Sequence, residues 1–183
     1  VQDEVIVVDD ASKDDTVDVC REFLASHCSA VWQVLTSKKN AGPPAARNIA
    51  IRQATGDVIM SVDQDDRWTA NHRAVLLKQM GDFDIVAGRA RFHLSPKVEA
   101  QSGRKWWRDH WLTEPQQFCE FGTSAIRRQC FESIGLLSET FRYGGDDVEW
   151  FARAQQQGLT RREIPVVVLE RTIHESNLSG DPQ

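Results

Sequence analysis

The sequence predicts an α/β fold in which a mostly parallel central sheet lies between two layers of helices. In the first half of the chain, apolar strand-like runs alternate with helix-like stripes, which is typical of a parallel sheet with right-handed crossovers. Carboxylates also follow directly after apolar runs, at the edge where open α/β sheets bind ligands. With 183 residues we expect one domain, 1–183, that is large enough to bury a sizeable core.

The first half of the chain supplies the alternation in a clear order. Its predicted strands are the apolar runs Glu4–Val8, Ala30–Leu35, Val58–Val62 and Asp84–Arg91. Between them we expect a helix with an apolar stripe from Val17 that closes near Ser26, a helix over Ala45–Ala54, and a helix capped by Thr69. The second of these follows a Gly-Pro-Pro loop and ends before Gly56, as proline and glycine preferences at helix ends require.

The second half of the chain is less regular. A polar surface loop is expected over Ser95–Arg104, and Lys105–Leu112 places Trp107 and Trp111 on one helical face. That face is more often core or a lid than a platform for sugar stacking. The remaining predicted elements are a strand at Phe121–Ile126, a helix at Phe131–Leu137 that stops at Gly135, a helix opened by Asp146 and Asp147, and a strand at Ile164–Leu169.

The stretch Val58–Asp66, VIMSVDQDD, concentrates acidic residues at the end of a predicted buried strand. The carboxylates of Asp63, Asp65 and Asp66 cannot lie unpaired in a dry core. Carboxylates at this spacing suit Mg²⁺ or Mn²⁺, hard cations that also bind substrate phosphates. We therefore expect a divalent cation site at this sheet edge.

Other candidate residues follow the ends of strands or precede helices. Asp9 and Asp10 end the first strand, and the switch-point rule favours a functional Asp10 over a simple turn residue. Asp146 fits a helix N-cap, whereas Asp147, one step further, fits a general base. A lone histidine is usually structural, but His174 just past the last strand could also be a metal ligand. Basic residues near the Gly-Pro-Pro loop, among them Arg47, face either phosphates or solvent.

Composition excludes several classes of protein. A net charge of −5 disfavours a nucleic-acid partner, and no apolar run approaches the ~20 residues that a membrane-spanning helix needs. No signal peptide is visible. The four cysteines form no Cys-x-x-Cys pair, which argues against a zinc site and favours a reducing compartment. We expect a cytoplasmic protein, and the tryptophan cluster Trp106–Trp111 is a candidate either for lining the acceptor side or for contact with a membrane surface.

Three phosphate- or metal-related alternatives fit the acidic stretch poorly. An EF-hand loop starting at Asp63 would have Trp68 in place of its glycine and Ala74 in place of its last glutamate. A receiver domain would need Thr/Ser and Lys strand ends after the phosphoacceptor, and no convincing pair is found. A dehalogenase-like phosphatase has the pattern Asp-x-Asp-x-Thr/Val. Starting from Asp63, the fifth position of this pattern is Arg67, which does not fit.

Six segments in order resemble a family 2 glycosyltransferase of the GT-A (Rossmann-like) fold. A single Asp-x-Asp is weak evidence of such a resemblance, but six ordered segments over nearly the whole chain are specific. The segments are VIVVDDASKDDT (Val5–Thr16), NAGPPAARNIAI (Asn40–Ile51), GDVIMSVDQDD (Gly56–Asp66), FGTSAIRRQCFESIGLLSE (Phe121–Glu139), GGDDVEWFARAQQQG (Gly144–Gly158) and RTIHESNLS (Arg171–Ser179).

The resemblance implies roles for particular residues. Asp10, with Asp9 beside it and Asn40 nearby, would contact the nucleotide. Asp63 and Asp65 would hold the ribose-diphosphate and a Mn²⁺ or Mg²⁺ ion, with Asp66 and His174 as further metal ligands. Asp146-Asp147 matches the family's Glu-Asp pair, so Asp147 would be the catalytic base. Residues 1–93 would form the nucleotide-sugar-binding half, and 94–183 the acceptor and catalytic half.

The implied reaction is transfer of a sugar from a nucleoside-diphosphate sugar to an acceptor hydroxyl. UDP-sugars are the commonest donors of this family, and the acceptor is a saccharide, lipid or peptide. One in-line displacement with Asp147 as base would invert the anomeric configuration. The family's first strand, helix and Pro-x-Tyr/Phe-Asn-like turn do not precede Val1, and Asp146 replaces a Glu. A nucleotide-sugar-binding module without catalysis is the alternative function.

Overall fold

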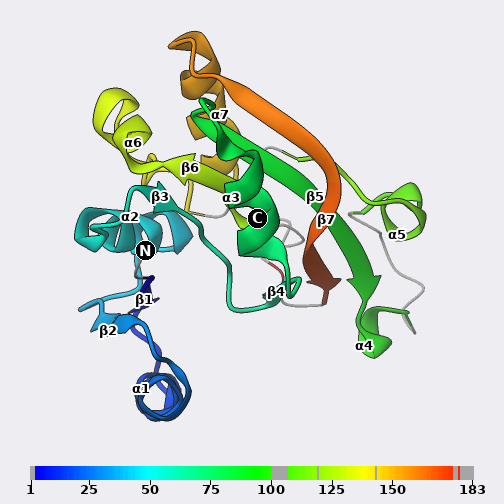
Figure 1. Cartoon of the computed structure of the whole chain (residues 1–183). Coiled ribbons are helices and arrows are strands. Elements are labelled where there is room, and N and C mark those ends of the chain that lie inside the picture. The colour runs from blue at the N-terminus through cyan, green and yellow to red at the C-terminus, as the bar shows by residue number, and fades with distance from the viewer. Residues whose placement is uncertain (1–2, 100–106, 119, 143, 175–176, 178–183) are drawn as a thin grey trace.

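The computed structural model describes residues 3–99, 107–118, 120–142, 144–174 and 177, and it shows an α/β arrangement with two sheets (Figure 1). Trp106 and residues 100–104 of the expected surface loop lie outside the described residues. Elements from both halves of the chain build the larger sheet, in the order β3-β6-β5-β7-β4. The sequence halves are therefore interleaved in space.

The five-stranded sheet is mixed in direction. Its long central strands, β5 (Ile85–Leu94) and β7 (Arg161–Ile173), run parallel to each other. The other three strands each pair antiparallel with a neighbour: β6 (Ser124–Arg127) with β5, β3 (Val58–Ile59) with β6, and β4 (Asp66–Trp68) with β7. The expected α/β class is confirmed, while the larger sheet is less parallel than the alternation of the first half suggests.

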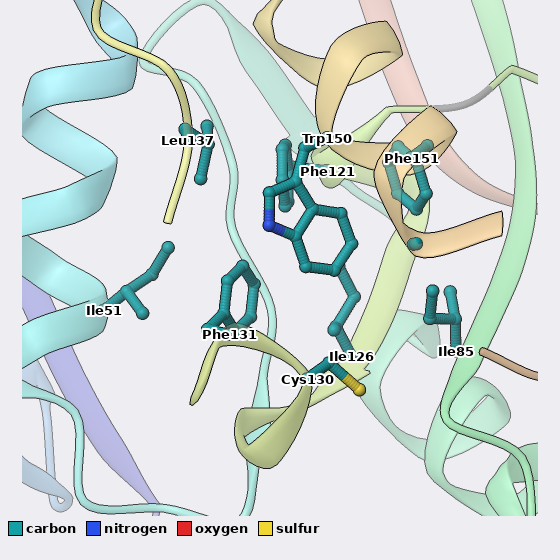
Figure 2. Close-up of a cluster of buried hydrophobic side chains, with 10 residues drawn as sticks. Ile51, Ile85, Phe121, Ile126, Cys130, Phe131, Leu137, Trp150 and Phe151 are labelled. Carbon is teal, nitrogen blue, oxygen red and sulfur yellow. The ribbon is translucent and has the colours of Figure 1, made fainter. Parts of the chain in front are cut away.

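Helices cover both faces of this sheet, because neighbouring residues of β5 and β6 point to opposite sides. Ile85 and Ile126 belong to one apolar cluster, which includes Phe131 of α6 (Arg128–Ile134) and Trp150 of α7 (Asp146–Gln156) (Figure 2). Their sequence neighbours Val86 and Ala125 join another cluster. That cluster contains Leu76 and Met80 of α3 (His72–Met80). The result is helix, sheet and helix in three layers.

The N-terminal elements form a smaller sheet. Strands β1 (Glu4–Asp9) and β2 (Val31–Thr36) pair in parallel along their whole length, joined by α1 (Thr16–His27). Helix α2 (Pro43–Gln53) leads from this sheet into the larger one, and its Ile51 joins the cluster around Trp150. The Glu4 carboxylate accepts a hydrogen bond from the Thr55 N–H at 2.9 Å, which attaches the end of α2 to β1.

Two turns fix how chain segments enter the site. Gly42 (φ 92°) precedes Pro43, and an added Cβ there would lie 3.1 Å from the Arg142 carbonyl oxygen, so both backbone and space favour glycine. Gly145 (φ 93°) is the N-cap of α7, which makes Asp146 the first helical residue. The expectation that Asp146 caps this helix is therefore wrong, and its carboxylate is available for a distant partner.

Several expected elements differ in length or pairing. The predicted strand Val58–Val62 is reduced to two residues at the edge of the sheet, and β4 begins only three residues after Asp63. Of the predicted helix Lys105–Leu112, the described part contains only α5 (His110–Thr113). Trp107 and Trp111 pack against the cluster of Phe92 and Leu169, in agreement with a core position. The short helices η1 (Phe121–Thr123) and α4 (Pro96–Glu99) complete the fold.

None of the helices in the described part of the chain has both the length and the apolar character needed to cross a membrane.

Candidate active site

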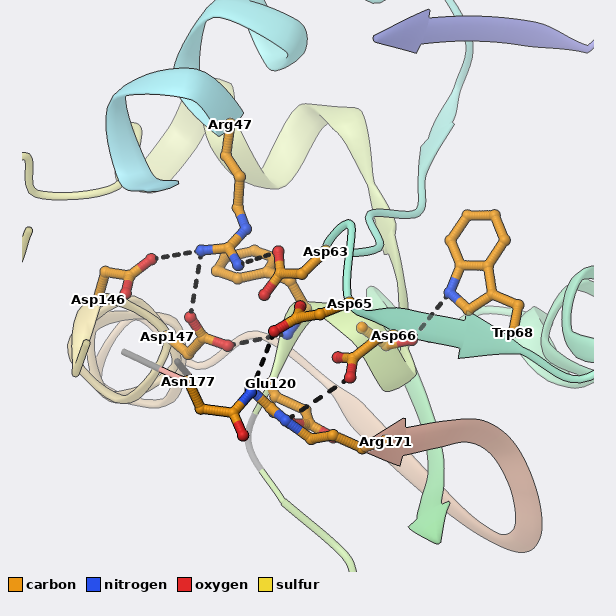
Figure 3. A network of polar contacts seen from close by, with 12 residues as sticks. Arg47, Asp63, Asp65, Asp66, Trp68, Glu120, Asp146, Asp147, Arg171 and Asn177 are labelled. Carbon is orange, nitrogen blue, oxygen red and sulfur yellow. Dashed lines mark hydrogen bonds and ion pairs between the residues drawn. The ribbon is translucent and has the colours of Figure 1, made fainter. Parts of the chain in front are cut away.

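Three carboxylates come together where the chain passes from β3 to β4. One oxygen each from Asp63, Asp65 and Asp66 lies within 4.8 Å of the others, and all three residues are half-buried (Figure 3). The Asp66 N–H donates to the Asp63 carbonyl at 3.1 Å, so a tight turn holds the three side chains on one side. The prediction that these acids gather is confirmed, but they lie in the turn before β4 and at its first residue, and not at the end of the strand Val58–Val62.

Arg47 of α2 connects this turn with the start of α7. Its Nη2 donates to Asp63, its Nη1 donates to Asp146 Oδ2 at 2.8 Å, and Nη1 lies 3.7 Å from Asp147 Oδ1. The Arg47 side chain is only 12% exposed. Burial lowers the pKa of its guanidinium, but the carboxylates of Asp63, Asp147 and Asp146 raise that pKa more. One buried cation thus holds together acids from distant parts of the sequence.

His174 approaches the same acids from the end of β7. Its Nε2 lies 3.0 Å from Asp65 Oδ2, and the Asn177 amide donates to the same oxygen at 3.1 Å. Asn177 Oδ1 in turn accepts a hydrogen bond from the His174 N–H at 2.6 Å, which orders this last turn. The structure therefore brings His174 to Asp65, as the sequence suggested for a metal ligand.

A second, half-buried cation, Arg171, lies on the other side of the acids. It stands opposite Asp66 in the pairing of β4 with β7, and Nη1 donates to Glu120 Oε2 at 2.7 Å. Burial raises the pKa of Asp66 to about 6, outweighing Arg171, which lowers it, and Asp65 adds to the increase. Burial likewise raises the pKa of Glu120 to about 7.

Asp147 lies in the first turn of α7, between Arg47 and the backbone of Phe121. The Phe121 N–H donates to its Oδ2 at 3.2 Å. Burial is the main cause that raises the pKa of Asp147 to about 6, and Asp146 contributes, while Arg47 opposes the shift. A carboxylate with such a pKa is largely ionised at neutral pH and still basic enough to accept a proton.

Asp9, Asp10 and Asn40 lie in a separate group at the start of α2. The Asp10 carboxylate accepts N–H bonds from Ala41 at 3.0 Å and from Gly42 at 2.7 Å, and Asn40 Nδ2 donates to the Asp10 carbonyl. Asp9 is buried and accepts from the Ser12 N–H. Both carboxylates organise turns, and α2 is the element that connects this group with the acids through Arg47.

The chemistry of the donor set fits a hard divalent cation. Carboxylate oxygens from Asp63, Asp65 and Asp66, with one imidazole from His174, match the preferences of Mg²⁺ and Mn²⁺ and lack the thiolates of a zinc site. An open pocket of about 480 Å³ adjoins Asp65 and Asp66. Its other lining residues include Arg67, Arg91, His93 and Glu170.

Sequence reasoning missed Glu120 and Arg171 and gave Arg47 no specific role. Glu120 stands alone in its segment, and nothing in the sequence distinguishes it from a surface glutamate. Arg171 begins a segment that carries the family resemblance, but its contact with Asp66 depends on the pairing of β4 with β7, and β4 was not predicted. Arg47 lies within a segment that carries the family resemblance, so its position in that segment was the available signal.

Known proteins resemble this chain in sequence. A model of a family described as glycosyl transferase family 2 matches residues 2–142. The succinoglycan biosynthesis protein ExoU of Rhizobium meliloti is 28% identical over 97% of this chain and 56% of its own length. The glycosyltransferase AglE of Haloferax volcanii is 25% identical, with 85% of this chain and 52% of AglE covered. The chain thus spans about half the length of these curated relatives.

Solved structures resemble it in fold. Staphylococcus aureus TarS 1–349, solved in complex with UDP-GlcNAc, has a TM-score of 0.73 at 17% identity, covering 98% of this chain and 52% of that one. The mannosyltransferase PcManGT from Pyrobaculum calidifontis, solved with GDP-Man and Mn²⁺, has a TM-score of 0.70 at 22% identity, covering 96% and 49%. These likenesses confirm the GT-A fold. Together with the match over residues 2–142, they lead to one conclusion: the chain belongs to glycosyl transferase family 2.

Proposed function

We propose that this chain is the catalytic part of a metal-dependent, inverting glycosyltransferase that moves a sugar from a nucleoside-diphosphate sugar to an acceptor hydroxyl. The main support for this proposal is a network of ion pairs in which Arg47 contacts both Asp63, in the turn of the three acids, and Asp147. A cation site for the departing diphosphate and a basic carboxylate for the acceptor are the two groups that such a reaction requires.

Residues 1–93 form the donor half of this proposal and 94–183 the acceptor and catalytic half. Asp10, with Asp9 and Asn40, would recognise the nucleoside at the start of α2, and Asp63 would face the ribose and diphosphate. A UDP-sugar is our preferred donor. The likeness to TarS, solved with UDP-GlcNAc, supports this choice, while PcManGT with GDP-Man makes a GDP-sugar the other candidate to test.

Asp65, Asp66 and His174 would hold Mn²⁺ or Mg²⁺. When bound, such a cation stabilises the negative charge that develops on the departing diphosphate. Asp65 is oriented for this role by two neighbours, since His174 and Asn177 both contact its Oδ2. Asp63 is in part neutralised by Arg47, which leaves Asp65 and Asp66 as the more available ligands.

Asp147 would remove the proton of the acceptor hydroxyl as that oxygen attacks the anomeric carbon. The Phe121 N–H fixes one of its oxygens and Arg47 lies 3.7 Å from the other, so its orientation is set before substrate binds. Asp146, hydrogen-bonded to Arg47, supports this arrangement from the preceding position. A single displacement with one base inverts the anomeric configuration.

The test is a screen of UDP- and GDP-sugars with saccharide, lipid and peptide acceptors, with MnCl₂ and with EDTA. We expect a glycosylated product of inverted configuration that forms only with the cation. Binding of UDP in calorimetry, with no product from any acceptor when the complete protein is used, would instead favour the nucleotide-sugar-binding module. A product of retained configuration would contradict the proposed mechanism.

A further inference from the structure

Glu120 is a buried carboxylate that the reaction proposed above does not use. Its side chain is only 9% exposed, and it lies in the segment before η1, beneath the three acids (Figure 3). Oε2 accepts a hydrogen bond from Arg171, whereas buried Oε1 has no hydrogen-bond partner among the described residues. Burying an unpaired carboxylate oxygen costs free energy, so the position of Glu120 needs a functional explanation.

Arg171 stands between Glu120 and Asp66 but binds them unequally. Its Nη1 is 2.7 Å from Glu120 Oε2, a charge-assisted hydrogen bond. Its Nε is 3.8 Å from Asp66 Oδ1, which is within ion-pair range but too long for a hydrogen bond. Strand pairing places Arg171 directly opposite Asp66, so the arginine could reach Asp66 if Glu120 did not hold it.

The Asp66 carboxylate is therefore left for another cation. The Asp66 side chain is only 4% exposed, and within the described ranges no hydrogen bond to its carboxylate is found. Its oxygen lies within 4.8 Å of those of Asp63 and Asp65. A guanidinium that closed onto Asp66 would occupy the lone pairs that a divalent ion needs.

The backbone of the same turn fixes the base. The hydroxyl of Ser124 donates to the Glu120 carbonyl at 2.7 Å, which anchors the turn. The next residue, Phe121, donates its N–H to Asp147. A shift of Glu120 would therefore change the position of Arg171 relative to Asp66 and the hydrogen bond from Phe121 to Asp147.

We propose that Glu120 is a positioning residue that anchors Arg171 away from Asp66 and so keeps the Asp66 carboxylate open to a divalent cation. This inference rests on the proposed function, because it concerns the same cation site. Above pH ~7, where Glu120 is ionised, Glu120→Gln removes the charge that holds Arg171, so the arginine closes onto Asp66 and competes with the metal. Removing the arginine as well removes the competitor.

The experiment titrates MnCl₂ alone against the chain and follows free Mn²⁺ by electron paramagnetic resonance, without donor or acceptor. We expect Glu120→Gln to weaken the Mn²⁺ Kd by about tenfold, the lower range for groups that orient metal ligands. The double variant Glu120→Met/Arg171→Met should return the Kd to within about threefold of the unmodified chain, because apolar replacement of a buried ion pair is often tolerated. Glu163→Gln, whose partner is Arg161 on the same strand, serves as the matched control and should leave the Kd unchanged.

Equal affinity in Glu120→Gln and the unmodified chain would overturn the inference alone. A double variant as weak as the single one, with thermal unfolding in EDTA showing that both are folded, would mean that the charge of Glu120 itself attracts the metal, and would also overturn it. An unmodified chain that binds no Mn²⁺ would instead refute the metal-dependent function, and this inference with it.

Discussion

Arg47 Nη1 donates a hydrogen bond to Asp146 Oδ2 at 2.8 Å, across 99 positions of sequence. The contact joins the helix that begins beside Asp10 to the helix that carries Asp147. Since Nη2 of the same side chain binds Asp63, one guanidinium links three parts of the site. The arrangement of the acids thus depends on a residue of opposite charge that is itself almost buried.

Replacing Arg47 with Met should lower the free energy of unfolding by about 3–5 kcal/mol, as expected when one partner of a buried ion pair is removed. Asp146 and Asp63 would be left without their cation. Chemical denaturation in the absence of metal measures the change. Arg52→Met on the same helix is the control, since Arg52 is 53% exposed and 4.0 Å from Glu139. Equal losses in the two variants would contradict the linking role of Arg47.

Asp147→Asn should lower kcat by about 10²–10⁴-fold, the usual contribution of a general base, while donor binding is retained. Asparagine can still accept the Phe121 N–H bond but takes no proton from the acceptor. Steady-state kinetics and UDP calorimetry separate the two effects. Glu149→Gln, in the same helical turn but paired with Arg153, is the matched control. Near-normal turnover in Asp147→Asn would exclude this residue as the base.

The activity should depend on pH through the same carboxylate. The pKa of Asp147 is raised to about 6, mainly by burial, and the base must be ionised to work. We therefore expect kcat/KM to fall with unit slope as the pH drops below about 6, and to be level above about 7. The residual activity of Asp147→Asn should lack this acidic limb. A limb that persists in the variant would assign the titration to another group.

Stability should respond to pH in the opposite sense. The folded pKa of Asp147 lies above the ordinary aspartate value of about 3.9, so its contribution to stability is full at low pH and is lost as pH rises through about 6. Asp147→Asn should therefore be more stable than the unmodified chain by about 1–3 kcal/mol at pH ~7.5, and nearly equal at pH ~4. Thermal unfolding in EDTA tests this, and a constant difference across this range would count against the raised pKa.

Local patterns in the sequence were sufficient to predict much of the fold. The apolar runs at Glu4–Val8 and Asp84–Arg91 became β1 and β5, and Gly135 ends α6 as expected. The direction of pairing was not predictable, because a run such as Val58–Val62 contains no information on its neighbour. That run became an edge strand antiparallel to β6, which left only two residues in the ladder.

The site was predictable where its residues have distinctive local patterns. The spacing of Asp63, Asp65 and Asp66 indicated the cluster, and the position of His174 after a strand indicated its approach to Asp65. The roles of Glu120 and Arg171 could not be predicted from local patterns, because they depend on the pairing of Asp66 with Arg171 between β4 and β7. The assignments of Asp9, Asp10 and Asn40 to the nucleotide remain predictions.

Anomalous scattering from a crystal grown with MnCl₂ and UDP would locate the divalent cation relative to the acids and the diphosphate. We expect one strong manganese peak at about 2.2 Å from oxygens of Asp65 and Asp66, next to His174 and touching the UDP diphosphate. A peak at another place, or UDP bound away from these acids with no manganese between them, would rule out the proposed metal site.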